Sequence, residues 1–255
     1  MWIDHGTNPA NASYSYVLLP ETTAADTAEY AQNPEITVLM NTDSAQAVYH
    51  KGLGITGINF WKDASVEVGD VTCDSQASVM LQEAENGLLT VAVSDPTMKN
   101  KGTIKLTIDK PVASVGDLDG NVTCEQKADG SVELSFAMER TNGASSYAEL
   151  QLAASIQAAA VTMETGESQE FELKDYEHTA GTAAWSVQGF ESELSSGTAV
   201  NENGVLTVDE NEKNQALTVT AKTESGLSLK AYISLGSDAI QELPEDMKKV
   251  KMEYH

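Results

Sequence analysis

Basic residues are scarce in this sequence. It holds 15 lysines and arginines against 39 aspartates and glutamates, a formal net charge of −24 at pH 7, and the acidic residues are spread along the whole chain. Affinity for phosphate backbones and for anionic lipid surfaces comes mainly from lysine and arginine. The composition therefore argues against nucleic acid as a partner and against an anionic membrane surface as a target.

Long apolar runs are also missing. No stretch of about 20 consecutive apolar residues occurs, so no membrane insertion is expected. Residues 1–6 lack the basic and then apolar order of a signal peptide, and we expect the chain to start as an excised fragment would. With 41% hydrophobic residues, the sequence has the composition of a folded globular protein of more than one domain.

Cysteine is rare as well. Only Cys73 and Cys124 occur, each directly after a Val-Thr pair, so each shares a strand face with the valine two residues before it. The two are therefore a candidate buried pair, and two interpretations stay open: a disulfide, which suits an exported protein, and two reduced core thiols. Two thiols without a neighbouring histidine make a poor zinc site, and no glycine-rich phosphate loop occurs. No metal or cofactor is expected.

Alternation of apolar and polar residues is the main pattern that is present. Residues 104–108 and 132–138 alternate almost perfectly, which is typical of strands in a half-buried antiparallel sheet. The Asn-Gly pair at 86–87 and the Asp-Gly pair at 129–130 indicate tight turns. Further strands are predicted at residues 14–19, 36–40, 45–49, 57–61, 79–82 and 88–93. The predicted fold class is all-β, built from antiparallel β-sandwich domains.

Helix signals are confined to two short segments. Residues 23–32 are rich in alanine, with Thr22 as a candidate N-cap before them and Pro34 ending the segment, because the residue before a proline disfavours helical geometry. In the tail, residues 244–246 read Pro-Glu-Asp and basic residues follow, which favours a short helix through its dipole. A linker without regular structure stays open for this tail.

A second β-rich unit follows a change of pattern after Arg140. The following stretch is first rich in Gly and Ser and then in Ala and Gln, and it ends near Ala160; it is predicted as an interdomain connection. From Val161 onward the pattern predicts a small, complete sandwich with Trp185 as its core tryptophan. Its inward-facing positions are Leu217, Val219, Ala221, Leu227, Leu229, Ala231, Ile233 and Leu235.

Several segments, taken in order, carry a family resemblance. They are His5-Gly6 with Pro9, Tyr14-Ser15-Tyr16 with Pro20, Asn41 with Gln-Ala-Val at 46–48, Asn-Phe-Trp at 59–61, and Leu-Leu-Thr-Val-Ala-Val-Ser-Asp-Pro-Thr at 88–97. This order resembles the end of the central β-domain and the C-terminal domain of polysaccharide lyase family 8, which contains hyaluronate, chondroitin and xanthan lyases. The resemblance covers roughly the first 140 residues.

The second unit resembles bacterial immunoglobulin-like domains of group 2. The resemblance rests on Trp-Ser-Val at 185–187, Asn-Gly-Val-Leu-Thr-Val at 203–208 and Leu-Thr-Val-Thr-Ala at 217–221. The last predicted sandwich is therefore immunoglobulin-like. The predicted domains are the end of the lyase central β-domain (1–62), the lyase C-terminal β-sandwich (63–145), a linker (146–156), the immunoglobulin-like domain (157–236) and a tail or linker (237–255).

The lyase resemblance implies an activity located elsewhere. In that family an N-terminal α/α toroid carries the Asn, His and Tyr that act on the uronic acid by β-elimination, and this sequence has no counterpart of it. The resemblance thus assigns no catalytic residue here and implies an inactive scaffold that contacts the toroid in a secreted or cell-surface enzyme. The polysaccharide would be bound by the parent enzyme, because the acidic charge of this part repels a polyanion.

The candidate binding residues are Tyr14 and Tyr16, which share one face of a predicted strand. They are predicted to pack at a domain interface or to stack on sugar rings. His5 beside Asp4 has the types of a general base and its orienting carboxylate, but adjacent strand residues point to opposite faces, which favours a structural loop. Residues 117–121 resemble part of a calcium loop and are predicted as a turn.

Two other functions compete with the scaffold interpretation. One is a stand-alone carbohydrate-binding or adhesive module that uses exposed aromatic residues such as Tyr14, Tyr16 or Trp61. The other gives residues 157–236 the role of a spacer. His50 and His178 lie near predicted turns without a visible partner and are expected on the solvated surface.

Overall fold

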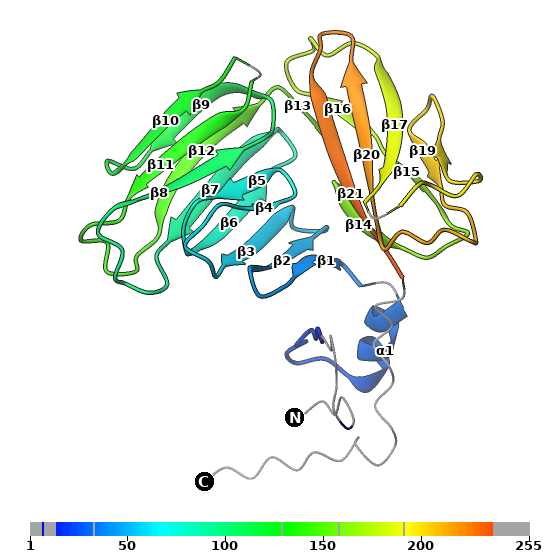
Figure 1. The fold of residues 1–255 in the computed structure, drawn as a ribbon, viewed down its shortest axis with the longest axis horizontal. Helices are drawn as coiled ribbons and strands as arrows, with labels where there is room; N and C mark the ends of the chain where they lie inside the picture. Colours follow the sequence, from blue (N-terminus) through cyan, green and yellow to red (C-terminus); the bar gives the residue numbers. More distant parts are fainter. Residues whose placement is uncertain are drawn as a thin grey trace. The chain divides into compact units, whose positions relative to one another are not determined.

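The computed structural model describes residues 7, 14–32, 34–128, 130–157, 159–190 and 192–236. The chain divides into two compact units, Met1–Pro34 with Asp238–His255 and Glu35–Ser237 (Figure 1). The described residues are mostly β, with 50% of them in strands and one short helix, and the antiparallel sheets form sandwich-like domains. The predicted fold class is confirmed. Among the described residues, no helix is long and apolar enough to cross a membrane.

The first unit contains the helix α1 (Ala24–Gln32). Its N-cap is Thr23 rather than the predicted Thr22: the Thr23 hydroxyl accepts the Asp26 N–H at 3.2 Å, and the Asp26 carboxylate accepts the Thr23 N–H at 3.2 Å. This reciprocal pair is a capping box. The strand predicted at residues 14–19 is wrong, because that segment pairs with no strand in the described part of the chain.

In the second unit, a seven-stranded and a five-stranded antiparallel sheet form the first sandwich, around one hydrophobic core that includes Phe60, Leu106 and Phe136. The seven-stranded sheet has the order β1 (Ile36–Asn41), β2 (Ala45–His50), β3 (Ile55–Phe60), β6 (Ala77–Glu83), β7 (Leu88–Ser94), β12 (Ser146–Leu152) and β9 (Val112–Leu118). The five-stranded sheet has the order β10 (Val122–Gln126), β11 (Val132–Ala137), β8 (Thr103–Ile108), β5 (Val71–Cys73) and β4 (Val66–Val68).

The strands predicted between residues 36 and 138 are confirmed with small shifts at their ends. Residues 146–156 differ from the prediction, because they form β12 and a short further strand instead of an irregular connection. Ala148, Leu150 and Leu152 are fully buried, and side chains without β-branching suffice there because neighbouring strands complete the packing. The seven-stranded sheet also continues across residue 62. The predicted domain boundaries themselves stay predictions.

The second sandwich has a core of its own that includes Phe171, Leu206 and Val219. Its strands are β13 (Ala154–Ile156), β14 (Ala160–Met163), β15 (Ser168–Glu170), β16 (Leu173–Asp175), β17 (Ala183–Gly189), β18 (Ala199–Val200), β19 (Val205–Thr207), β20 (Ala216–Thr223) and β21 (Ser228–Leu235). They pair in the orders β14-β21-β20-β17, β15-β19-β18 and β13-β16. The β14–β21 pair is parallel, an exception to the predicted antiparallel pairing.

Most of the predicted inward-facing positions of this sandwich are buried, and only Leu227 and Leu235 are partly exposed. Trp185 was expected inside the core but packs against its edge and stays partly exposed. The reason is its place on β17, the outermost strand of the four-stranded sheet, where one flank of the side chain has no neighbouring strand.

The two cysteines lie in one cross-strand row of the five-stranded sheet. Cys73 pairs with Leu106, Leu106 with Leu134, and Leu134 with Cys124. Three strand spacings therefore separate the thiols, roughly 14 Å between their Cα atoms, against the roughly 4–7 Å that a disulfide allows. Both cysteines face the core as expected, but they are free thiols, not a bonded pair.

We predict unequal reactivity for these thiols. Burial raises the pKa of Cys73 to about 11, and it raises the pKa of the less buried Cys124 as well. In the folded protein near pH 8.5, iodoacetamide should modify Cys124 faster than Cys73, because the thiolate is the reactive form. Mass spectrometry of time points measures this, with guanidinium-unfolded protein as the control in which both react. If neither cysteine reacts in unfolded protein without reductant, the two form a disulfide, which would contradict their assignment as free thiols.

Candidate functional site

Tyr14 and Tyr16, the residues predicted from the sequence, are both exposed, and their rings stack on each other. The ring planes are 14° apart and the centroids 6.4 Å apart. More than half of each side chain is open to solvent. The pair forms a small aromatic surface in the first unit, and its role in binding sugar or another domain stays a prediction. His5 lies outside the described residues.

The other polar candidates have local structural partners. The Asp119 carboxylate accepts the Tyr147 N–H at 2.8 Å and its carbonyl accepts the Val122 N–H at 2.8 Å. A turn therefore spans residues 119–122, whereas Asp117 and Leu118 of the predicted turn belong to strand β9. His50 is only partly exposed and has a partner, because its Nε2 lies 3.5 Å from the Glu35 carboxylate. The expectation of an isolated surface histidine was wrong for His50.

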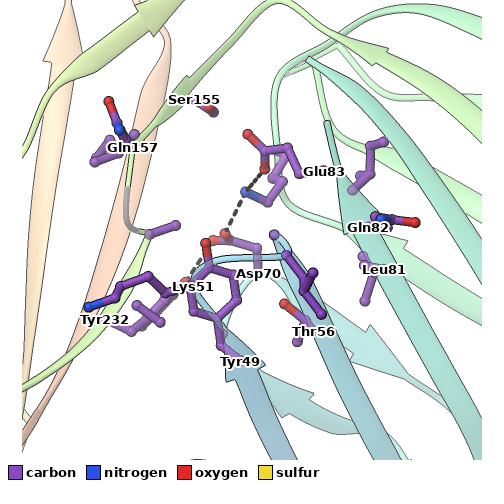
Figure 2. A pocket seen from close by; sticks show the side chains of 18 of the residues that line it. Tyr49, Lys51, Thr56, Asp70, Leu81, Gln82, Glu83, Ser155, Gln157 and Tyr232 are labelled. Atoms are coloured by element: carbon purple, nitrogen blue, oxygen red, sulfur yellow. Dashed lines mark hydrogen bonds and ion pairs between the residues drawn. The ribbon is translucent and has the colours of Figure 1, made fainter. Parts of the chain in front are cut away.

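A cavity of about 610 Å³ lies where the two sandwiches of the second unit meet (Figure 2). The first sandwich contributes Asp70, Glu83 and Lys110 to its lining, and the second contributes Tyr176 and Tyr232. These are titratable side chains, so this cavity is where acid–base chemistry would be expected if the described residues carried any.

Lys110 is the central charge of the cavity. Its Nζ donates to Glu83 at 3.2 Å and lies 3.6 Å from the Asp70 carboxylate. Burial of the lysine opposes its charge, but the carboxylates of Glu83 and Asp70 outweigh burial and raise the pKa of Lys110. Burial raises the pKa of Asp70. Lys110 therefore stays charged, because two acidic side chains compensate for its removal from water.

The second sandwich completes this network. The Tyr232 hydroxyl on β21 donates to Asp70 at 2.7 Å, and burial together with the Asp70 charge raises the pKa of Tyr232. On the same strand, Lys230 donates to Asp109 at 2.7 Å. The Tyr176 hydroxyl donates to Glu83 at 3.4 Å.

Backbone packing also joins the two sandwiches. The ring of Tyr176 lies so close to Gly87 that a Cβ atom at this position would be 2.4 Å from it. Gly87 has a φ of +79°, so both its conformation and its neighbour require glycine. Because the network from Lys110 to the two tyrosines joins side chains of both sandwiches, the arrangement is a structural joint between them. The sequence held no local signal of it, since its members are far apart along the chain.

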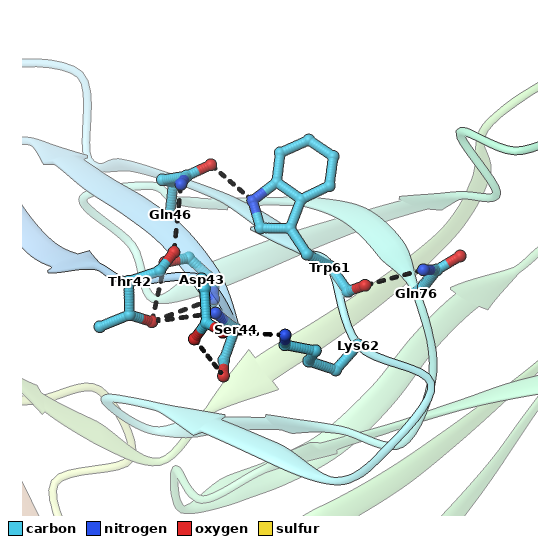
Figure 3. A network of polar contacts seen from close by, with 8 residues as sticks. Thr42, Asp43, Ser44, Gln46, Trp61, Lys62 and Gln76 are labelled. Atoms are coloured by element: carbon cyan, nitrogen blue, oxygen red, sulfur yellow. Dashed lines mark hydrogen bonds and ion pairs between the residues drawn. The ribbon is translucent and has the colours of Figure 1, made fainter.

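A second polar network lies at the end of β3 (Figure 3). The Trp61 indole donates through Nε1–H to the Gln46 side chain, and Gln46 in turn donates to the Thr42 carbonyl at 3.1 Å. Gln76 donates to the Trp61 carbonyl at 2.7 Å. The indole is thus fixed in orientation while 44% of the residue remains exposed. It is a rigid aromatic surface next to the outer face of the seven-stranded sheet.

Comparison with known proteins gives a consistent match over part of the chain. Residues 37–105 match the polysaccharide lyase family 8 C-terminal beta-sandwich domain. The chain is 40% identical over 152 residues to the xanthan lyase of Bacillus sp. strain GL1, covering 60% of this chain and 16% of that enzyme. It is 34% identical over 154 residues to the hyaluronate lyase of Thermasporomyces composti, covering 60% of this chain and 19% of that enzyme. The chain spans less than a fifth of the length of these relatives.

Solved structures extend the match. The chondroitin AC lyase of Streptomyces coelicolor A3 in complex with chondroitin sulphate superposes with a TM-score of 0.51 at 29% identity, covering 58% of this chain and 19% of that one. Paenibacillus xanthan lyase superposes with a TM-score of 0.55 at 25% identity, covering 93% of this chain and 29% of that one. Part of the chain is therefore homologous to the C-terminal region of family 8 lyases, which are larger than the chain.

The joint between the sandwiches gives a stability prediction. Replacing Tyr232 with Phe removes the hydroxyl that donates to the buried Asp70, so the free energy of unfolding should fall by ~1–3 kcal/mol. Urea denaturation of the full chain at neutral pH measures the change. Tyr147→Phe is the matched control, because that residue is 47% exposed and its variant should stay within ~0.5 kcal/mol of the parent. Equal midpoints for both variants would contradict the role of Tyr232.

Proposed function

We propose that the chain is the non-catalytic C-terminal part of a secreted polysaccharide lyase that cleaves uronic-acid-containing polysaccharides, such as hyaluronan, chondroitin or xanthan, by β-elimination. The main observation behind this proposal is the homology to xanthan, hyaluronate and chondroitin lyases. The matched segment makes up less than a fifth of each of these enzymes. Because such polymers are met outside the cell, the parent enzyme is proposed to be extracellular or bound to the cell surface.

The chemistry of the reaction supports a scaffold role. β-Elimination requires a group that neutralises the uronate carboxylate, a base that removes the adjacent proton and an acid that protonates the leaving oxygen. In the cavity between the sandwiches, Lys110, Asp70 and Tyr232 already bind one another or Glu83. These groups hold two sandwiches together. They present neither a base nor an acid to a substrate.

The charge of the chain supports the same role. With a net charge of −24, its surface repels a polyanionic substrate. The substrate groove is therefore proposed to lie mainly in the part of the parent enzyme that contains the catalytic toroid. The chain would support that toroid and bind it as an intramolecular partner.

We predict that the full chain, incubated with hyaluronan, chondroitin or xanthan, produces no unsaturated uronate. The ultraviolet absorbance of that product is the measurement, and an intact family 8 lyase is the positive control. Addition of the separately expressed catalytic part of the parent should give activity that the chain increases or stabilises. Turnover by the chain alone would show that catalysis does not lie elsewhere.

A further inference from the structure

We infer that the outer face of the seven-stranded sheet is a binding site for a neutral polysaccharide chain. The site is a trough of about 410 Å³ that β2, β3, β6, β7 and β12 form. It lies apart from the joint between the sandwiches. The inference does not depend on the proposed lyase parentage, because it rests on the surface of the first sandwich alone.

The floor of the trough is an apolar row with one residue from each strand. In register, Val48 lies beside Gly57, Gly57 beside Met80, Met80 beside Ala92 and Ala92 beside Tyr147. Val48, Met80 and Tyr147 are each more than 40% exposed, whereas Gly57 and Ala92 are small and leave hollows between them. The row crosses four strand spacings, ~19 Å, which is long enough for several sugar rings.

A polar row runs directly beside the apolar one. In register, it consists of Gln46, Asn59, Ser78 and Ser94. The Ser78 hydroxyl donates to the Asn59 side-chain oxygen at 2.7 Å, which orients the Asn59 amide nitrogen as a donor. Amides and hydroxyls can both donate and accept hydrogen bonds. A sugar ring has the matching arrangement, with apolar C–H faces and hydroxyl groups around its edge.

Charge distinguishes a neutral polysaccharide from a polyanion. None of the residues that line the trough is charged, although 21% of the chain is charged and the net charge is −24. An anionic chain would gain no ion pair in the trough and would be repelled by the surrounding surface. A neutral chain meets neither disadvantage. The trough therefore selects against the polyanions that the proposed parent enzyme cleaves.

Trp61 lies at the margin of the trough. It follows Asn59 by two residues, so it stands past the polar row, on the side away from the apolar row. Its indole is bonded to Gln46, a member of the polar row, and this bond holds the ring in one orientation (Figure 3). Holding the ring before binding reduces the entropy that is lost on binding. Tryptophan is among the residue types most enriched at positions where truncation costs most in binding. Trp61 is thus the residue on which affinity should depend most.

The test is affinity electrophoresis of the full chain in native gels that contain a soluble neutral glucan, mannan or xylan, or hyaluronan. We expect retardation by at least one of the neutral polymers, little affected by salt, and none by hyaluronan. Trp61→Ala should weaken the apparent affinity about tenfold or more. Phe190→Ala is the matched control, because Phe190 is an 82% exposed aromatic residue of the second sandwich and its loss should change nothing.

A second variant tests the trough without weakening the fold. A Cβ at Gly57 would have only a Val48 methyl group as its neighbour, at 4.0 Å, so Gly57→Val fills a hollow in a strand that favours valine. Its unfolding midpoint should be unchanged or higher, while retardation by the neutral polymer is lost.

Three results would overturn the inference. They are no retardation by any neutral polymer, salt-sensitive retardation by hyaluronan, and unchanged retardation of Gly57→Val. Sedimentation of the chain without sugar tests whether a second copy of the chain occupies this face. A dimer that Gly57→Val dissociates would show that the face is an interface between two copies and would also overturn the inference. The lyase assay tests the proposed function and the gel assay tests the trough. Failure of one proposal therefore does not decide the other.

Discussion

The buried charge of Lys110 is the constraint on which the arrangement of the second unit depends. An ammonium group taken out of water without a partner costs several kcal/mol, so Lys110 requires its carboxylate partners. Glu83 and Asp70 supply them from the first sandwich. Asp70 in turn binds the Tyr232 hydroxyl, which lies on the second sandwich. Through Asp70, the buried charge of Lys110 thus links the first sandwich to strand β21 of the second.

This coupling gives the second sandwich a defined place beside the first. Tyr176 packs over Gly87, and Lys230 binds Asp109, so apolar packing and ion pairs act together at the joint. A sandwich attached only through a linker would need none of these contacts. Within the second unit, the two sandwiches are therefore held together by specific contacts and are not independent modules.

The cavity at the joint and the trough on the seven-stranded sheet differ in chemical character. The lining of the cavity at the joint includes Lys110, Asp70 and Glu83, three charged side chains that bind one another. The trough on the seven-stranded sheet is lined by uncharged residues, several of them exposed apolar side chains. The contrast separates a surface that holds the protein together from one that is open to a partner.

Local patterns in the sequence determined most of the strands. Alternation identified β8 and β11, because one side chain in two must face the core on each strand. The same criterion wrongly predicted a strand at residues 14–19, where no partner strand exists in the described chain. It missed β12, in which neighbours on β7 and β9 complete the packing of the buried residues Ala148, Leu150 and Leu152.

The sequence by itself determined the fold class, the acidic surface, the facing of Cys73 and Cys124 toward a core, and Trp61 as a candidate exposed aromatic residue. Only the tertiary structure decided that the cysteines lie too far apart to bond, that Lys110 joins Asp70 and Glu83, and that Gly57 and Met80 share one trough. The reason is that side-chain periodicity depends on near neighbours in the chain. Register and domain contacts depend on residues that are distant in the sequence and meet only after folding.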